Sequence, residues 1–170
     1  MLMELVAFHI AVLLCVAGLL VAAAVGDVRR YRISNRLCVA MVVLFPFFVL
    51  TAPHSLDWKQ HAMVFALVGT SGYAMFLGHL AGAGDMKLLA VTGLWAGPHL
   101  VAVLLVTTAL AGGVLALVVA VVTWIKNRSA RLAHQPEVPV SRVPIPYGIA
   151  IAAGGFNVLY RLSQPILFPG

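Results

Sequence analysis

The chain has 170 residues, enough for one domain, and 62% of them are hydrophobic while only 9% are charged. Soluble domains carry roughly 25% charged residues, so this composition excludes that class and predicts an all-α membrane protein. The net charge of +6 does not indicate nucleic-acid binding, because the basic residues are grouped at the ends of apolar runs. We therefore expect a single transmembrane domain over residues 1–170, with the lipid bilayer as its surroundings.

Six apolar runs follow one another along the chain. They cover residues 5–25, 37–51, 61–80, 86–96, 99–125 and 144–162. Since a helix needs about 20 apolar residues to cross a bilayer, these runs predict a polytopic bundle of about six transmembrane helices. The fourth run is short and ends at Gly97-Pro98, so a re-entrant or broken fourth helix is also compatible with the sequence.

The loops between these runs predict the orientation of the chain in the membrane. The basic residues that follow the first run and the fifth run are Arg29, Arg30, Arg32, Arg36, Lys126, Arg128, Arg131 and Arg142. By the positive-inside rule these two loops are cytoplasmic and both termini lie outside. Two helices separate Asp27 from Asp85, so both aspartates are expected at the cytoplasmic boundary and Asp57 at the opposite one.

Two aspartates are placed unusually for a membrane protein. Asp27 closes the first apolar run, and Asp85 closes the sequence Gly82-Ala83-Gly84-Asp85. A carboxylate near bilayer depth is costly and often functional. Two adjacent carboxylates rarely both ionise, so one can take a proton from water while the other polarises a carbonyl, as in aspartic proteases. From these residues alone, a proton or ion transporter is an equal alternative, and either aspartate by itself can be a solvated helix cap.

No cofactor is predicted. The six histidines are scattered without ligand spacing, and Cys15 and Cys38 form no CxxC pair. The aspartic-protease chemistry also needs no metal and no covalent intermediate. We therefore expect neither a metal site nor a structural disulfide.

Three motifs give the chain a family resemblance. They read Asp27-Val-Arg-Arg-Tyr-Arg-Ile-Ser-Asn35, Gly82-Ala-Gly-Asp-Met-Lys87 and Pro144-Ile-Pro-Tyr-Gly148. In order and spacing they resemble the first aspartate motif, the GxGDxK motif and the late Pro-Tyr-Gly motif of type IV prepilin peptidases. Two positions depart from the family pattern: Ser34 stands where proline is frequent, and Ile149 stands where proline often follows the glycine.

The resemblance implies a function and a set of site residues. Asp27 and Asp85 would be the catalytic pair of a membrane-embedded aspartic endopeptidase that removes the basic leader from a prepilin, just before the pilin's hydrophobic helix. The supporting residues would be Asn35, Gly82, Gly84, Lys87, Pro146, Tyr147 and Gly148. The chain looks like the short, peptidase-only Tad/Flp type, without the cytoplasmic zinc and methyltransferase region of larger members. This type implies a bacterial inner membrane and an active site at the cytoplasmic face. The sequence does not decide the oligomeric state.

Several alternatives remain open at the level of sequence. The whole chain could instead be a small proton-coupled transporter, or a pilus or secretion assembly factor without protease activity. Asn35 could orient a carboxylate or the substrate, or simply cap the second helix. Lys87 could tune Asp85 or contact lipid phosphate, and Tyr147 could bind substrate or anchor the chain at the interface.

Overall fold

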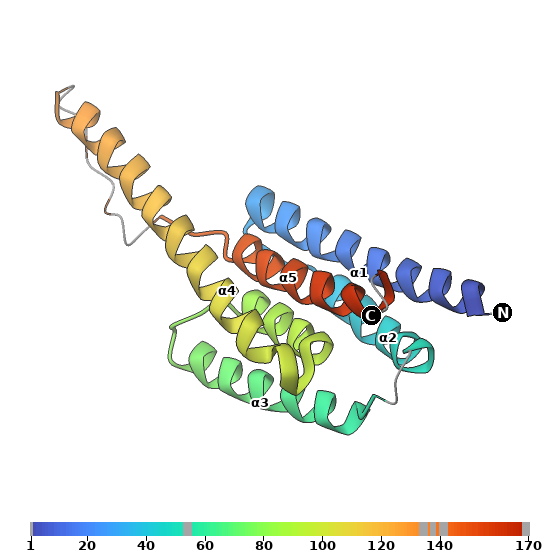
Figure 1. Ribbon diagram of the computed structural model, residues 1–170. Coiled ribbons are helices and arrows are strands. Elements are labelled where there is room, and N and C mark those ends of the chain that lie inside the picture. The colour runs from blue at the N-terminus through green and yellow to red at the C-terminus, as the bar shows by residue number, and fades with distance from the viewer. Residues whose placement is uncertain (1, 53–55, 133–135, 137–138, 140–142, 168–170) are drawn as a thin grey trace.

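The computed structural model describes residues 2–52, 56–132, 136, 139 and 143–167, and every regular element within them is an α-helix (Figure 1). The five helices are α1 (Leu2–Arg30), α2 (Asn35–Thr51), α3 (Trp58–Leu77), α4 (Ala83–Leu132) and α5 (Gly148–Leu167). The all-α fold class is therefore confirmed. By length and composition, two segments could cross a membrane, Met3–Arg30 and Ala83–Leu132, so the expected six transmembrane helices are not shown.

The first helix is longer than its apolar run. α1 continues past residue 25 to Arg30, so Asp27 lies inside its last turn and not beyond its end. The helix ends where Tyr31 adopts a left-handed conformation with φ of 50°, and the Tyr31 N–H still donates to the Asp27 carbonyl at 2.8 Å. The backbone around Asp27 is therefore helical and fixed by regular hydrogen bonds.

The next two helices begin at side-chain caps. Ser34 caps α2 by accepting a hydrogen bond from the Arg36 N–H, and Asp57 caps α3 by accepting one from the Lys59 N–H. The interpretation of Asn35 as the α2 cap is therefore wrong, because the residue before it supplies the oxygen. Asp57 begins α3 at the far end of that helix from the turn that leads to Asp85.

The fourth and fifth apolar runs form two helical limbs, together labelled α4, that meet at a sharp kink, as the sequence Gly97-Pro98 predicts. α4 is non-helical only at Gly97, where φ is 59°, a conformation that glycine adopts without strain. Pro98 has no N–H, so the Leu94 carbonyl lacks its usual helical donor. The ring of His61, from α3, donates from Nδ1 to that oxygen at 2.7 Å and fills the space beside Gly97. The bend is thus held by a side chain from a neighbouring helix.

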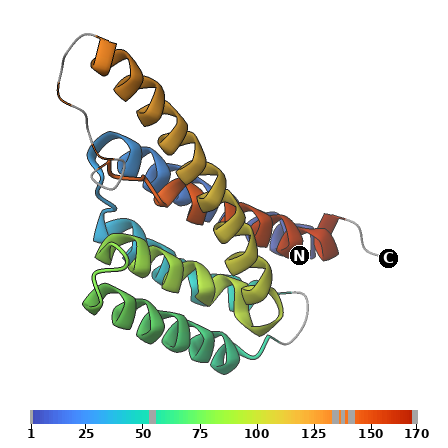
Figure 2. The same cartoon turned by 90° about the vertical axis from the view of Figure 1, so that its left-hand side faces the viewer.

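The bend divides α4 into a proximal limb, residues 83–97, and a distal limb, residues 98–132. The proximal limb lies beside α3, and the distal limb turns back and extends away from the bundle (Figures 1 and 2). At about 1.5 Å per residue the distal limb is roughly 50 Å long, more than the roughly 30 Å of a bilayer core. The polar loop expected from residue 126 is therefore helical as far as Leu132. Most of its remainder, including Arg142, lies outside the described residues.

The last helix starts later than its apolar run. Pro144 and Pro146 precede α5, which begins at Gly148 and packs against both α1 and α4. Proline restricts the residue before it to extended conformations, which explains why the helix cannot begin at residue 144. The helix expected from the apolar run that begins at residue 144 therefore starts only at Gly148, although the Pro146 carbonyl accepts the Ile149 N–H at 3.2 Å.

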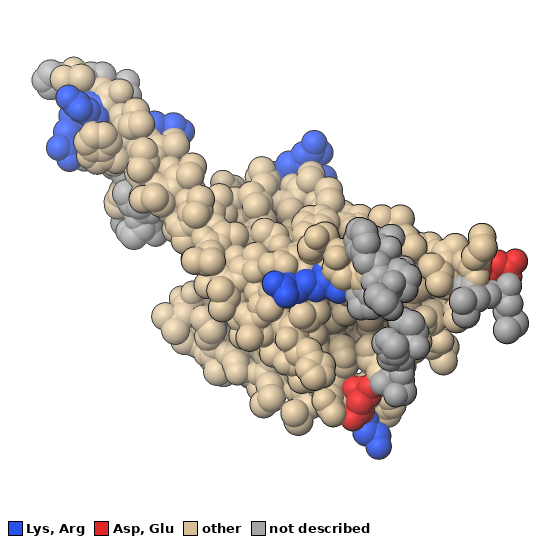
Figure 3. All heavy atoms as spheres, in the orientation of Figure 1, with Lys and Arg blue, Asp and Glu red and all other residues tan. Residues whose placement is uncertain are grey.

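The buried core and the outer surface have the composition expected of a membrane bundle. Fully buried side chains include Leu20, Met41, Leu88, Trp95 and Ile151. The face in Figure 3 carries few charged side chains, and basic ones gather at the far end of α4. Val106, Leu110, Val114 and Leu117 of the distal limb are more than half exposed, which suits contact with lipid and not with water.

Candidate active site

Asp27 is held at the point where α1 meets the start of α5. Its side chain is only 5% exposed, and its Oδ2 accepts a hydrogen bond from the Gly148 N–H at 2.7 Å. A Cβ on residue 148 would lie 2.9 Å from both Cβ and Oδ2 of Asp27. Glycine is therefore needed there for the backbone to approach the carboxyl group so closely.

Asp85 lies in the first turn of α4 and is half-buried. A Cβ on Gly82 would lie 2.8 Å from Asp85 Oδ2, and a Cβ on Gly84 would lie 3.4 Å from the Cβ of Ile33. The first glycine thus leaves room for the carboxyl group, and the second lets the connection between α1 and α2 approach the start of α4. Both glycines of the second motif therefore have a local packing reason.

The structure brings the two predicted catalytic aspartates to one pocket. This pocket, of about 250 Å³, is lined by Asp27, Tyr31, Arg32, Ile33, Gly82, Ala83, Gly84 and Asp85. Both carboxyl groups belong to its wall. They come from helices that are distant in sequence, and the pocket joins the first two motifs. We call it the dyad pocket.

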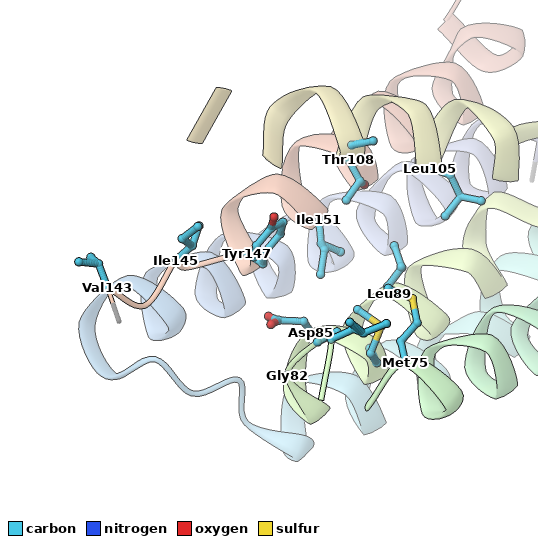
Figure 4. Close-up of a pocket in the computed structure, with 14 residues that line it drawn as sticks. Met75, Gly82, Asp85, Leu89, Leu105, Thr108, Val143, Ile145, Tyr147 and Ile151 are labelled. Atoms are coloured by element: carbon cyan, nitrogen blue, oxygen red, sulfur yellow. The ribbon is translucent and has the colours of Figure 1, made fainter. Parts of the chain in front are cut away.

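Asp85 also belongs to the wall of a second, larger pocket (Figure 4). Its volume is about 520 Å³, and apart from Asp85 its walls are mainly apolar. Leu89 comes from the proximal limb of α4, Leu105 and Thr108 come from the distal limb, and Tyr147 precedes α5. We call it the apolar pocket. Tyr147 therefore lines the pocket that also includes Asp85.

Two supporting residues lie to one side of these pockets. Lys87 Nζ donates a hydrogen bond to Asn35 Oδ1 at 3.3 Å, and both side chains are exposed. Neither side chain lines the dyad pocket or the apolar pocket. The contact links the start of α2 to the start of α4, so these two residues join the elements that carry the site.

Some site residues could not be found from the sequence. Leu105, Thr108 and Ala109 line the apolar pocket, yet they belong to a continuous apolar run without any motif. They reach the site only because α4 folds back at Gly97. The role of His61 could not be predicted either. The carbonyl to which it donates lacks a helical donor only because of a proline on another helix.

Among the described residues, no group of three or more His, Cys, Asp or Glu side chains could hold a metal ion. The expectation of a metal-free site stays a prediction. Cys15 and Cys38 are free thiols, the first exposed and the second buried.

A comparison with protein families decides the broad identity of the chain. The family model of the type IV leader peptidase family matches residues 13–117, which is more than half of the sequence. The chain belongs to this family. It is therefore a prepilin peptidase, a hydrolase of the membrane whose substrates are prepilins. No curated protein and no solved structure gave a match.

Proposed function

We propose that Asp27 and Asp85 are the catalytic dyad that cleaves the basic leader from prepilins of the Flp type. The observation that supports this most is their convergence on one pocket from the last turn of α1 and the first turn of α4. The family assignment makes the reaction a peptide hydrolysis, and these are the two carboxyl groups at the pocket. The peptidase unit proposed is the single transmembrane domain of residues 1–170.

The chemistry follows from two adjacent carboxyl groups of which one holds a proton. The ionised group removes a proton from a water molecule, whose oxygen attacks the carbonyl carbon of the scissile peptide bond. The protonated group donates to the carbonyl oxygen as charge develops there. When the C–N bond breaks, a proton passes to the leaving amine. The products are a leader with a new carboxylate and a mature pilin with a new amino terminus.

The hydrogen bond to Gly148 contributes to this arrangement by fixing one carboxyl group. Because Asp27 Oδ2 accepts the Gly148 N–H, its other oxygen is the one free to meet water or the second carboxyl group. A group held in this way loses less conformational freedom in the transition state. The site then works without reorganising Asp27 during the reaction.

The position of the dyad also suits a substrate that is half membrane-embedded. Asp27 is followed closely by Arg29, Arg30 and Arg32, which by the positive-inside rule puts this end of the bundle at the cytoplasmic face. Water reaches such a boundary more easily than the bilayer centre. We propose that the prepilin approaches laterally, with its hydrophobic helix in the bilayer and its leader in the cytoplasm.

The test is cleavage of a Flp-type prepilin by membranes that contain single variants. Asp27→Asn and Asp85→Asn should each reduce cleavage by at least about 1,000-fold while the protein remains inserted, because an amide cannot exchange the catalytic proton. Asp57→Asn is the matched control, since asparagine also caps a helix well and residue 57 begins α3. Substantial activity in either of the first two variants would refute the dyad, and proton or solute flux without cleavage would favour the transporter.

A further inference from the structure

Among the described residues, two other than glycine adopt a left-handed backbone conformation, Tyr31 with φ of 50° and His79 with φ of 56°. Each follows the end of a helix. The Tyr31 N–H donates to the Asp27 carbonyl at the end of α1, and the His79 N–H donates to the Phe76 carbonyl at the end of α3. Glycine is the usual residue at this position, because a Cβ is disfavoured in the left-handed region. Both positions therefore carry backbone strain that glycine would remove.

The two strained residues differ in their surroundings. Tyr31 lines the dyad pocket together with Asp27 and Asp85, whereas His79 lines neither the dyad pocket nor the apolar pocket. The 2.8 Å hydrogen bond from the Tyr31 N–H to the Asp27 carbonyl also fixes the backbone of the two residues relative to each other. The strain at the end of α1 thus occurs where a side chain is presented to the proposed catalytic group.

The Tyr31 side chain is available for contact with another molecule. It is 54% exposed, and among the described residues nothing hydrogen-bonds to its hydroxyl or stacks on its ring. Strain that persists at a functional site is often part of how that site works. A half-exposed tyrosine ring offers a large, rigid apolar surface with a polar tip, which suits contact with a peptide.

We propose that Tyr31 is a substrate-contacting residue, whose ring packs against the prepilin backbone at the scissile bond and holds that segment beside Asp27. This inference rests on the proposed function, since it requires cleavage at the dyad. Arg32, on the same wall of the pocket, has the same charge as a basic leader and is less suited to hold it. The left-handed conformation of residue 31 is then retained because it places this ring at the pocket.

The first experiment measures kcat and KM of the full chain in proteoliposomes with a Flp-type prepilin. Tyr31→Asn removes the ring but keeps a residue that tolerates the left-handed region, and Tyr31→Gly removes the ring and the strain together. Both should raise KM by about 3- to 10-fold, as expected when half of a large side chain is no longer covered by substrate. The change in kcat should be small, because the contact is made before and during the reaction. Tyr31→Phe keeps the ring and should keep the wild-type KM.

His79→Asn and His79→Gly are the matched controls, since residue 79 has the same backbone conformation but does not line either pocket. Both should leave kcat and KM unchanged. Thermal unfolding in detergent should show that neither glycine variant melts below the wild type, because glycine relieves the left-handed conformation. A melting temperature of Tyr31→Gly well below that of His79→Gly would mean that packing within the fold offsets the strain, and would overturn the inference.

The second experiment detects the contact without turnover. Benzoylphenylalanine in place of Tyr31 keeps an aromatic ring at the dyad pocket. In the Asp85→Asn background it should crosslink to the prepilin residues that flank the scissile bond. The same probe in place of His79 should give no such crosslink, and equal crosslinking from both positions would contradict a specific contact at Tyr31.

The outcomes separate this inference from the function on which it rests. Absence of cleavage of every Flp-type prepilin by the wild type would overturn the proposed function. Cleavage by the wild type with an unchanged KM in Tyr31→Gly and Tyr31→Asn would overturn the inference alone, and would mean that Tyr31 is an interfacial anchor. A fall in kcat without a change in KM would also overturn it, because the residue 31 backbone would then act through Asp27. A KM raised as much in Tyr31→Phe as in Tyr31→Gly would overturn the ring contact in favour of the hydroxyl.

Discussion

The Gly148 contact with Asp27 makes a quantitative prediction. In Gly148→Ala the new Cβ would lie 2.9 Å from Cβ and Oδ2 of Asp27, closer than such atoms normally approach, so one of the two groups must move. The movement would lengthen or break the 2.7 Å hydrogen bond from the residue 148 N–H to Oδ2. A hydrogen bond to a charged group contributes about 1.5–3 kcal/mol, and each 1.36 kcal/mol corresponds to a tenfold change in rate.

We therefore expect Gly148→Ala to lower kcat for prepilin cleavage by about 10- to 150-fold. The effect should fall mainly on kcat, with a smaller effect on KM, because it disturbs a reacting group and not the apolar pocket. A carboxyl group displaced by about 1 Å can by itself cost on the order of 100-fold, which gives the same range. The assay is the initial rate of leader release in proteoliposomes, with thermal unfolding of the purified variant in detergent as the check on folding.

Gly113→Ala is the matched control for this substitution. A Cβ at residue 113 would meet nothing within 4 Å, and the residue lies within α4. Alanine is favoured over glycine in a helix by about 0.5–1 kcal/mol, so this variant should be slightly more stable and fully active. If Gly148→Ala folds as well as Gly113→Ala and cleaves within twofold of the wild-type rate, the bond to Asp27 does not position the catalytic group.

Two further predictions concern the packing that shapes the site. His61→Phe keeps a ring beside Gly97 but removes the donor to the Leu94 carbonyl, so the free energy of unfolding in detergent should fall by about 1–3 kcal/mol; an unchanged value would mean that water or another group satisfies this oxygen. Gly154→Ala should lower the free energy of unfolding by a similar 1–3 kcal/mol, because it overpacks α5 against α4. The new Cβ would contact Thr108 Oγ1 and lie 2.9 Å from the Leu104 carbonyl oxygen. A melting temperature of Gly154→Ala equal to that of Gly113→Ala would contradict this close packing.

The parts of the fold that could be predicted are those encoded locally. The low charge content and the long apolar runs were sufficient to predict the all-α membrane class, because a soluble domain needs many more charged residues on its surface. The Gly-rich motif before Asp85 marked the start of α4, whereas α1 continues past its apolar run and includes Arg29 and Arg30. These signals depend on a few adjacent residues and need no knowledge of what lies next to them in space.

The parts that could not be predicted depend on contacts between distant segments. Gly97-Pro98 was correctly interpreted as the boundary between two helical segments, but the His61 ring of α3 that holds this kink could not be predicted. Of the two roles open for Asn35, the cap of α2 is wrong: Ser34 caps the helix, and only the backbone geometry decides between two adjacent side chains that could both accept the hydrogen bond. The start of α5 was placed too early because hydrophobicity continues through Pro144 and Pro146, where the helix cannot form.

The glycines of the second and third motifs share one physical explanation, and it connects the three motifs to each other. Gly82 leaves room for the Asp85 carboxyl group, Gly148 leaves room for that of Asp27, and Gly84 lets Ile33 approach the start of α4. Each glycine therefore acts on a neighbour that belongs to the dyad or to the segment beside it, and two of the three neighbours come from another motif. A Cβ at residue 148 meets an atom of a different helix, whereas one at residue 82 meets only the mobile end of a side chain three residues away. For this reason the third motif, far from either aspartate in sequence, should tolerate an added methyl group less well than the first glycine of the second motif.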